Sequence, residues 1–231
     1  MLPEADSSAV AKRLITQGEA EPAFTAMIER VVAQGQIVVD VGAGVGYYTC
    51  LMARAVGERG RVIAIEPWPT AVRYLRHNVE LNGLERVTIV PAAAFDRSGQ
   101  AHLEAPAYRL TMGGHRPPGA VDVRAERLDD FAEVRLLRRL DTIRLDVAGA
   151  ELRALRGMMA TLSRWQPMVL LAVQPTLLRT YDDSLDDLYR FLGDLDYGYA
   201  PVEGPLAGDD GFHLAAAPVT RLYSHGLVPV S

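Results

Sequence analysis

This sequence of 231 residues has almost no lysine or cysteine, and its acidic residues outnumber its basic ones. Lys12 is the only lysine, so a Schiff-base lysine and a P-loop lysine have essentially no candidate. Cys50 is the only cysteine, which excludes an internal disulfide framework and a cysteine-based zinc site. The formal net charge of −5 gives no overall attraction to phosphate groups, and we therefore expect no nucleic-acid partner.

The sequence also lacks a hydrophobic run of membrane-spanning length. Its first residues, "MLPEADSSAVAKRL", carry acidic side chains where a signal peptide would be basic and then apolar. We expect no membrane partner and a cytoplasmic location. Half of the residues are hydrophobic, enough for one substantial core. We assign residues 1–34 to an N-terminal helical segment, a candidate cover for an acceptor site, and residues 35–231 to one globular domain.

Apolar runs and helical patterns alternate along the chain. Strands are expected at residues 37–41, 61–66, 87–90, 142–146 and 168–173, and helices at residues 20–33, 47–56, 70–83, 151–163 and 184–192. In the helix at 151–163, Leu152, Leu155, Met159 and Leu162 form the expected buried stripe. This alternation predicts an α/β fold with a doubly wound, mostly parallel sheet. Residues 197–218 are expected to add an antiparallel pair at one edge, and residues 100–120 look like an insertion.

The stretch "VVDVGAGVGYYT", residues 38–49, joins the first strand of this sheet to a helix. Gly42, Gly44 and Gly46 give a G-x-G-x-G spacing, whereas the dinucleotide fingerprint needs its third glycine where this chain has Tyr47. Asp40 before the turn would oppose bound phosphates but suits the cationic methionine end of S-adenosylmethionine. Glu66, at the end of the second strand, is placed to accept hydrogen bonds from ribose hydroxyls, a role that NAD-binding proteins share.

Several stretches resemble the FkbM-type S-adenosylmethionine-dependent methyltransferases. They are "GEAEPAFTAMIERVVAQGQIVVDVGAGVGYYT", "IEPWPTAVRYLRHNVELNG", "RLDDF" and "DTIRLDVAGAELRALRGM", within residues 18–175. The resemblance implies the seven-stranded class I methyltransferase fold, S-adenosylmethionine as methyl donor, and usually O-methylation of a hydroxyl on a sugar or other specialised metabolite.

The same resemblance implies a set of cofactor residues. The expected set is Asp40, Gly42, Ala43, Gly44, Tyr47, Glu66, Pro67, Trp68, Ala93 and Asp146. Trp68 is expected beside the adenine or ribose, Ala93 at the adenine edge, and Asp146 near the methionine end or the acceptor. Two positions depart from the family pattern, because Ala148 and Ala172 stand where carboxylates are usual.

Three residues are candidates for the catalytic step. Asp146 would orient the acceptor hydroxyl, with a helix N-cap as the alternative. Glu151 is either a site residue or a first-turn acid that favours the helix dipole. His115 is either a base that closes over the acceptor or a solvated loop histidine. Gln174 is either a hydrogen-bond partner of the acceptor at the end of the fifth strand or a polar loop residue.

No metal is expected. The acidic pairs Asp129-Asp130 and Asp182-Asp183 look like helix starts, Asp186-Asp187 like an exposed helix face and Asp209-Asp210 like a turn. Solvated structural roles are therefore expected for all four pairs.

Two other functions stay open on the sequence. One is an NAD-dependent oxidoreductase, and the other is a non-catalytic protein of this fold that binds S-adenosylmethionine, motivated by Ala148 and Ala172. A small organic acceptor is expected from the moderate apolar and aromatic content of residues 100–120 and of the tail beyond residue 197. A homodimer is a further possibility.

Overall fold

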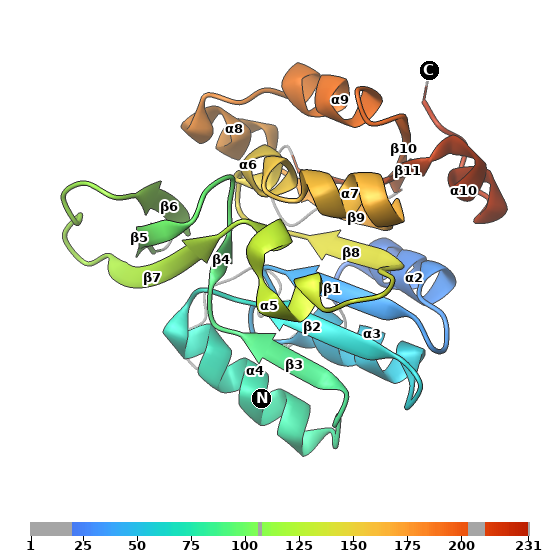
Figure 1. The fold of residues 1–231 in the computed structure, drawn as a ribbon, viewed down its shortest axis with the longest axis horizontal. Helices are drawn as coiled ribbons and strands as arrows, with labels where there is room; N and C mark the ends of the chain where they lie inside the picture. The colour runs from blue at the N-terminus through green and yellow to red at the C-terminus, as the bar shows by residue number, and fades with distance from the viewer. Residues whose placement is uncertain (1–19, 106–107, 203–210, 231) are drawn as a thin grey trace.

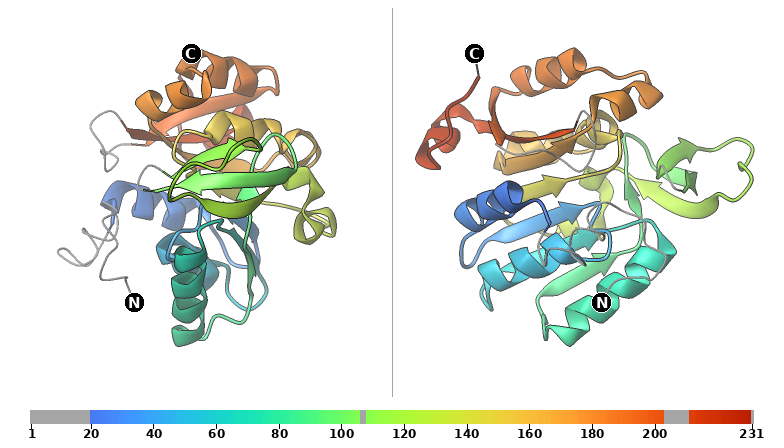
Figure 2. Two further views of the ribbon diagram at one scale, coloured as in Figure 1. Left: turned by 90° about the vertical axis from the view of Figure 1, so that its left-hand side faces the viewer. Right: turned by 180° about the vertical axis from the view of Figure 1, so that it is seen from behind.

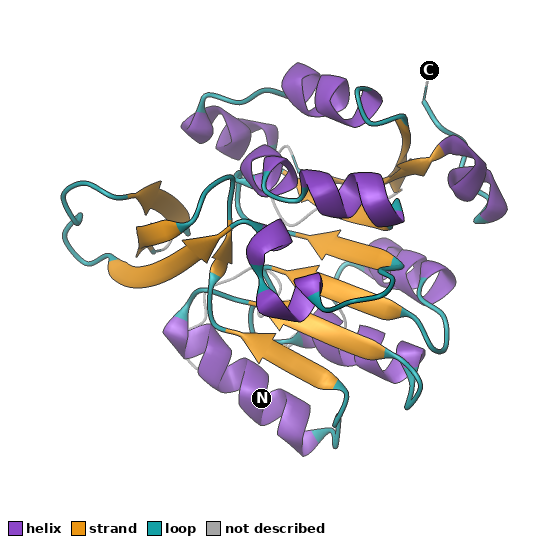
Figure 3. Cartoon of the chain, viewed as in Figure 1, coloured by secondary structure: helices purple, strands orange, loops and turns teal. Residues whose placement is uncertain are grey.

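The main structural unit is a seven-stranded sheet, seen in a computed structural model that describes residues 20–105, 108–202 and 211–230 (Figures 1 and 3). Its strand order is β10-β11-β9-β8-β1-β2-β3. The strands are β1 (Ile37–Val41), β2 (Arg61–Ile65), β3 (Val87–Val90), β8 (Thr142–Leu145), β9 (Met168–Val173), β10 (Tyr197–Val202) and β11 (Phe212–Pro218). The five neighbouring strands β9, β8, β1, β2 and β3 are paired in parallel. The doubly wound, mostly parallel sheet expected from the sequence is therefore confirmed.

The antiparallel pair expected from residues 197–218 is β10 and β11. β11 pairs antiparallel with both β9 and β10, and it lies between them, one place in from the edge of the sheet. His213 in β11 pairs with Ala172 in β9. The C-terminal strands are thus part of the sheet that carries the rest of the fold.

Helices cover both faces of the sheet because successive strand residues point in opposite directions. Val39 and Val41 belong to one core, whereas Val38 belongs to the core on the opposite face. The first core packs under α5 (Ala132–Arg135), α6 (Glu151–Arg156), α7 (Met159–Trp165), α8 (Pro175–Leu178) and α9 (Leu185–Gly193). The other face packs against α2 (Pro22–Val31), α3 (Tyr47–Val56), α4 (Pro69–Leu81) and α10 (Val219–Ser224), and α2, α3 and α4 lie in front in the right-hand view of Figure 2. The chain also forms two short 3-10 helices, η1 (Leu128–Asp130) and η2 (Arg179–Tyr181).

Residues 100–120 are expected as an insertion, and their described part contributes to a second sheet at the carboxyl end of the main one (Figure 1). Its order is β4-β7-β5-β6, with β4 (Ala93–Ala94), β5 (Gly99–Glu104), β6 (Arg109–Met112) and β7 (Val121–Glu126). Ala101, Leu103, Leu110 and Val123 build a small apolar cluster there, and Trp68 packs against it. β7 alternates apolar and polar residues, whereas β4 and β6 are too short to show a period-2 pattern.

The helix expected at residues 151–163 is two helices, α6 and α7. At Gly157 the chain passes so close to Phe95 that a Cβ atom would lie 1.9 Å from the Phe95 carbonyl oxygen. The break shifts the helical phase, so that Met158 is buried and Met159 is 40% exposed. The prediction of Met159 in the buried stripe was therefore wrong.

The acidic pairs are less solvated than the sequence indicates. Asp129 accepts hydrogen bonds from the Ala160 and Thr161 N–H groups and so caps α7 from outside the helix. Asp183 is buried and paired with Arg153 and Arg156, so the expected solvated helix start was wrong.

Of the other pairs, Asp186 is exposed as expected, and Asp187 forms a capping box with Ser184. Asp209-Asp210 lie outside the described residues. Within the residues that the structure describes, no helix has the length and apolar character needed to cross a membrane.

Candidate cofactor and active site

A cavity of about 310 Å³ opens at the carboxyl ends of the parallel strands, where ligands bind in sheets of this kind. Its wall combines the glycine turn after β1, the segments after β2, β3 and β8, the second sheet and the start of α2. The residues that decide its chemistry are Glu21, Gly44, Tyr47, Tyr48, Glu66, Pro67, Ala93, Leu103, Tyr108, Leu110, Arg144, Asp146, Ala148 and Gln174. Of the expected cofactor residues, Gly42, Ala43, Gly44, Tyr47, Glu66, Pro67, Ala93 and Asp146 line it.

The glycine turn is shaped by two different needs. Gly42 has a φ of 80°, and a Cβ atom there would lie 1.8 Å from the Asp146 carbonyl oxygen, so the turn can pass β8 only as glycine. Gly44 has a φ of 55°, and a Cβ atom there would meet no atom within 4 Å. Open space beside bare backbone is what a ligand needs in order to approach the chain closely.

Glu66 braces this turn from the end of β2. Its Oε2 atom accepts the Gly44 N–H at 2.8 Å, and its Oε1 atom accepts the Trp68 N–H at 2.8 Å. Burial of the carboxylate raises the pKa of Glu66 to about 7, against the lowering effect of the two backbone donors. The side chain is held at the cavity wall, with carboxylate oxygens that can accept further hydrogen bonds.

Arg144, in the middle of β8, organises the floor of the site. It pairs with Asp40 in the strand register, and its Nη1 atom lies 2.9 Å from Asp40 Oδ1. Its Nη2 atom lies 2.6 Å from Asp146 Oδ2, and Nη1 also donates to the Gly42 carbonyl at 3.2 Å. The guanidinium lies 4.3 Å from the centre of the Tyr48 ring. One cation thus holds two carboxylates and the glycine turn together.

Asp40 lies beneath the cavity and is not part of its lining. It is fully buried, and besides Arg144 it accepts a hydrogen bond from the Thr49 hydroxyl at the start of α3. Asp40 holds Arg144, and Arg144 in turn donates to the glycine turn. The sequence suggested a direct contact between Asp40 and the methionine end, whereas the structure places Asp40 behind the cavity lining.

Asp146 reaches the cavity wall, two residues after Arg144 on the same face of the sheet. Burial raises the pKa of Asp146, Arg144 acts in the opposite direction, and Glu21 raises it further. The N-cap of α6 is Ala150, so the alternative of Asp146 as the cap residue of that helix is wrong.

The other candidates lie elsewhere. Glu151 is buried at the start of α6, where Oε1 accepts the Gly149 N–H at 3.0 Å, and it does not line the cavity. His115 is exposed in the loop between β6 and β7 and is also outside the lining. Trp68 packs behind the wall, in edge contact with Tyr108 at 5.7 Å between ring centres.

Arg144, Glu21 and Tyr48 were missing from the residues selected from the sequence. Arg144 does leave a signal, because a charged residue within the apolar run "TIRLD" needs a buried partner. Glu21 and Tyr48 leave none, since their contacts join segments far apart in the chain. Among the described residues, no group of three or more His, Cys, Asp or Glu side chains could hold a metal ion, and the absence of a metal stays a prediction.

Comparisons with known proteins identify a family and a fold for this chain. The family model described as "Methyltransferase FkbM domain" matches residues 40–200. A curated relative is a protein-L-isoaspartate O-methyltransferase of Aeropyrum pernix, 37% identical over 83 residues. That match covers 36% of this chain and 31% of the relative, so the chain spans about a third of that protein.

Two solved structures share the fold. Fibrillarin of Aeropyrum pernix, in complex with natively bound S-adenosyl-L-methionine, has a TM-score of 0.56 at 16% identity, over 85% of this chain and 74% of that one. Precorrin-6y C5,15-methyltransferase of Geobacter metallireducens has a TM-score of 0.53 at 20% identity, over 92% of this chain and 94% of that one. The fold is that of the class I methyltransferases.

The chain belongs to the FkbM methyltransferase domain family, because the family model covers more than half of it. S-adenosylmethionine is the cofactor of this family. The site fits it, since open backbone at Gly44, a buried carboxylate at Glu66 and the apolar wall of Ala93, Leu103 and Leu110 lie around one cavity.

Proposed function

We propose that this chain transfers a methyl group from S-adenosylmethionine to an oxygen atom of a small organic acceptor. The observation that carries the proposal is the meeting of Gly44, Glu66 and Asp146 in one cavity at the carboxyl edge of the sheet. When bound, the cofactor supplies an activated methyl group on a positively charged sulfur. The protein then needs chiefly to hold the acceptor in line, an effect worth up to roughly 7–11 kcal/mol.

Each expected site residue has a role that its place supports. Glu66 accepts hydrogen bonds from the ribose hydroxyls, and Ala93, Pro67 and Leu110 contact the adenine. The second sheet, which brings Leu103, Tyr108 and Leu110 to the cavity, therefore covers the nucleoside. Asp146 orients the acceptor hydroxyl, and its raised pKa makes it a better hydrogen-bond acceptor than an ordinary aspartate.

Oxygen is favoured as the acceptor atom by the polar groups at the cavity end near β8 and β9. Asp146 and Gln174 directly follow these two strands and line the cavity, so the Asp146 carboxylate and the Gln174 amide can position a hydroxyl. The Aeropyrum pernix relative is itself named an O-methyltransferase. The cavity volume and the acidic lining favour a small molecule over a nucleic acid.

Isothermal titration tests the proposal. We expect S-adenosylhomocysteine to bind and NADH not to bind, and we expect Glu66→Gln to weaken S-adenosylhomocysteine binding by roughly 10- to 100-fold because charged hydrogen-bond acceptors are lost. Glu85→Gln, at an exposed glutamate, is the matched control. Radiolabelled donor incubated with a small-molecule extract, and separately with total RNA, reports the acceptor class. Binding of NADH alone would refute the proposal, and tight cofactor binding without transfer to either fraction would favour a non-catalytic protein.

A further inference from the structure

Glu21 is a buried carboxylate at the cavity wall, outside residues 40–200 that the family model matches. It precedes α2 with a φ of 49° and a ψ of 67°, in the left-handed region that favours glycine. As N-cap residue of α2 it makes no side-chain cap hydrogen bond. Its side chain is directed to another part of the molecule.

Two side chains from distant segments hold the Glu21 carboxylate. The Tyr48 hydroxyl, from the first turn of α3, donates to Oε2 at 2.6 Å. His213 Nε2, from β11, lies 3.6 Å from the same oxygen. The His213 ring stacks on Phe24 of α2 with ring centres 3.8 Å apart and planes 12° from parallel. Glu21 is therefore fixed in position by α2, α3 and β11 together.

The charge of the cavity wall indicates what kind of group Glu21 meets. Among the described residues that line the cavity, Glu21, Glu66 and Asp146 carry carboxylates, and Arg144 carries the basic group. Arg144 also neutralises Asp40 below the floor, so the wall has an excess of negative charge. A buried carboxylate is stabilised when a cationic ligand binds beside it.

The order of the three carboxylates gives a direction to the ligand. The glycine turn joins Glu66 to Arg144, because Glu66 accepts the Gly44 N–H and Arg144 Nη1 donates to the Gly42 carbonyl. Arg144 Nη2 lies 2.6 Å from Asp146 Oδ2. The Arg144 guanidinium lies 4.3 Å from the centre of the Tyr48 ring, and the Tyr48 hydroxyl donates to Glu21. With the ribose on Glu66, the amino-acid end of the cofactor runs past Asp146 toward Glu21.

We propose that Glu21, positioned by Tyr48 and His213, binds the α-ammonium group of the cofactor's methionine moiety. This inference rests on the proposed use of S-adenosylmethionine and adds to it a cofactor contact from outside the matched domain. The N-terminal end of α3, which carries Tyr48, provides positive potential beside Glu21 for the α-carboxylate.

The test compares two ligands that differ at the amino-acid end. S-adenosylhomocysteine carries the α-amino and α-carboxylate groups, whereas 5′-methylthioadenosine lacks both and keeps the nucleoside. Glu21→Gln preserves the shape of the side chain and removes its charge. We expect the variant to bind S-adenosylhomocysteine roughly 10- to 100-fold more weakly in calorimetry and to bind 5′-methylthioadenosine within about twofold of the wild type.

A thermodynamic cycle isolates the ammonium group. An S-adenosylhomocysteine analogue without the α-amino group should lose affinity for the wild type and no further affinity for Glu21→Gln. Tyr48→Phe should weaken S-adenosylhomocysteine binding by a smaller factor, about 2- to 10-fold. Glu29→Gln, at an exposed glutamate of the same helix, is the matched control, and circular dichroism spectra verify the fold of each variant.

The outcomes separate this inference from the proposed function. If the wild type binds neither S-adenosylhomocysteine nor 5′-methylthioadenosine, the proposed function itself fails. If the wild type binds both, and Glu21→Gln leaves their affinity ratio unchanged, the assignment of Glu21 is wrong while the proposed function stands. If removal of the α-amino group lowers the affinity of the wild type and of Glu21→Gln by the same factor, the assignment of Glu21 is also wrong.

Discussion

At the scale of single residues, Glu151 carries one of the most strongly perturbed carboxylates of the described chain. It is 1% exposed, and Oε2 has no hydrogen-bond partner among the described residues, whereas Oε1 accepts the Gly149 N–H. Burial raises the pKa of Glu151 from 4.5 to about 7. In the folded state the protonated form of Glu151 is therefore favoured below a pH of about 7.

This shift sets the sign of a pH effect. A carboxyl group whose pKa is higher in the folded state loses stabilisation as the pH rises from 4.5 through 7, by up to about 3 kcal/mol here. Glu151→Gln cannot ionise, so its free energy of unfolding should rise relative to that of the wild type by about 2.5 kcal/mol between pH 5 and pH 8. Urea unfolding at several pH values measures the difference, and two parallel stability profiles would contradict the expectation.

A single residue's role could be predicted where its contacts are close to it in the sequence. The glycine turn and Glu66 could be placed from local spacing, because strand, turn and helix fix their positions within a few residues. Arg144 could have been found from its apolar surroundings. Glu21 could not, since its position depends on Tyr48, 27 residues away, and on His213 near the other end of the chain. Of the two alternatives given for His115, the structure shows the exposed loop histidine, and the direction of a loop has no local signal that could have decided between them.

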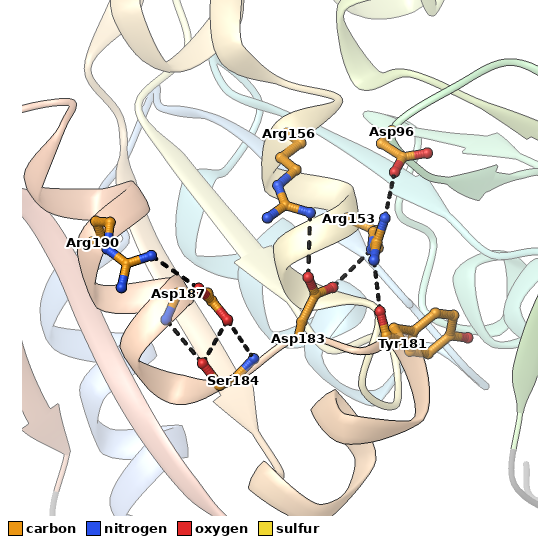
Figure 4. A network of polar contacts seen from close by, with 8 residues as sticks. All are labelled: Asp96, Arg153, Arg156, Tyr181, Asp183, Ser184, Asp187 and Arg190. Carbon is orange, nitrogen blue, oxygen red and sulfur yellow. Dashed lines mark hydrogen bonds and ion pairs between the residues drawn. The ribbon is translucent and has the colours of Figure 1, made fainter.

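At the scale of elements, a network of ion pairs attaches the second sheet to the rest of the fold (Figure 4). Arg153 of α6 contacts Asp183 at 2.7 Å, Asp96 at 3.3 Å and the Tyr181 carbonyl at 2.6 Å. The Tyr181 hydroxyl accepts the Leu110 N–H of β6 at 2.7 Å. This path joins α6, η2 and the strand that carries Leu110 to the cavity wall.

Asp183→Asn tests this attachment. The amide loses the charge that binds Arg153 and Arg156, and we expect the free energy of unfolding to fall by roughly 1–3 kcal/mol. Chemical denaturation measures the change. Asp186→Asn, at an exposed position three residues away, should stay within about 0.5 kcal/mol of the wild type. Equal effects of the two substitutions would show that the network adds no stability.

Elements differed in how well the sequence predicted them. Long amphipathic helices and fully apolar strands were placed within one or two residues, because many residues repeat the same period. The second sheet and the break between α6 and α7 were missed. Short strands carry little periodicity, and the break depends on the close approach of Phe95 to Gly157, a contact across 62 positions.

At the scale of the whole molecule, the cavity takes residues from α2, both sheets and the segments after β1, β2 and β8. A ligand that binds there is linked to all of these parts at once. The alternation of strands and helices was sufficient to predict the sheet and the edge at which the cavity opens. The attachment of the second sheet could not be predicted, because it depends on side-chain contacts between distant segments.

Ligand-linked unfolding tests whether these parts form one cooperative unit. S-adenosylhomocysteine at about 100 times its dissociation constant should stabilise the native state by about 2.7 kcal/mol. For a chain of this size the thermal midpoint should rise by roughly 5–11 °C in a single transition. A second transition that does not respond to the ligand would show that the second sheet unfolds independently.

The place of β11 between β9 and β10 has a consequence during synthesis on the ribosome. β9, whose six residues are all buried in the finished sheet, emerges about forty residues before its antiparallel neighbour. Until Pro218 has left the exit tunnel, the nascent chain presents an unsatisfied apolar edge that other polypeptides can join. The contact of His213 with Glu21 can form only when that interval ends.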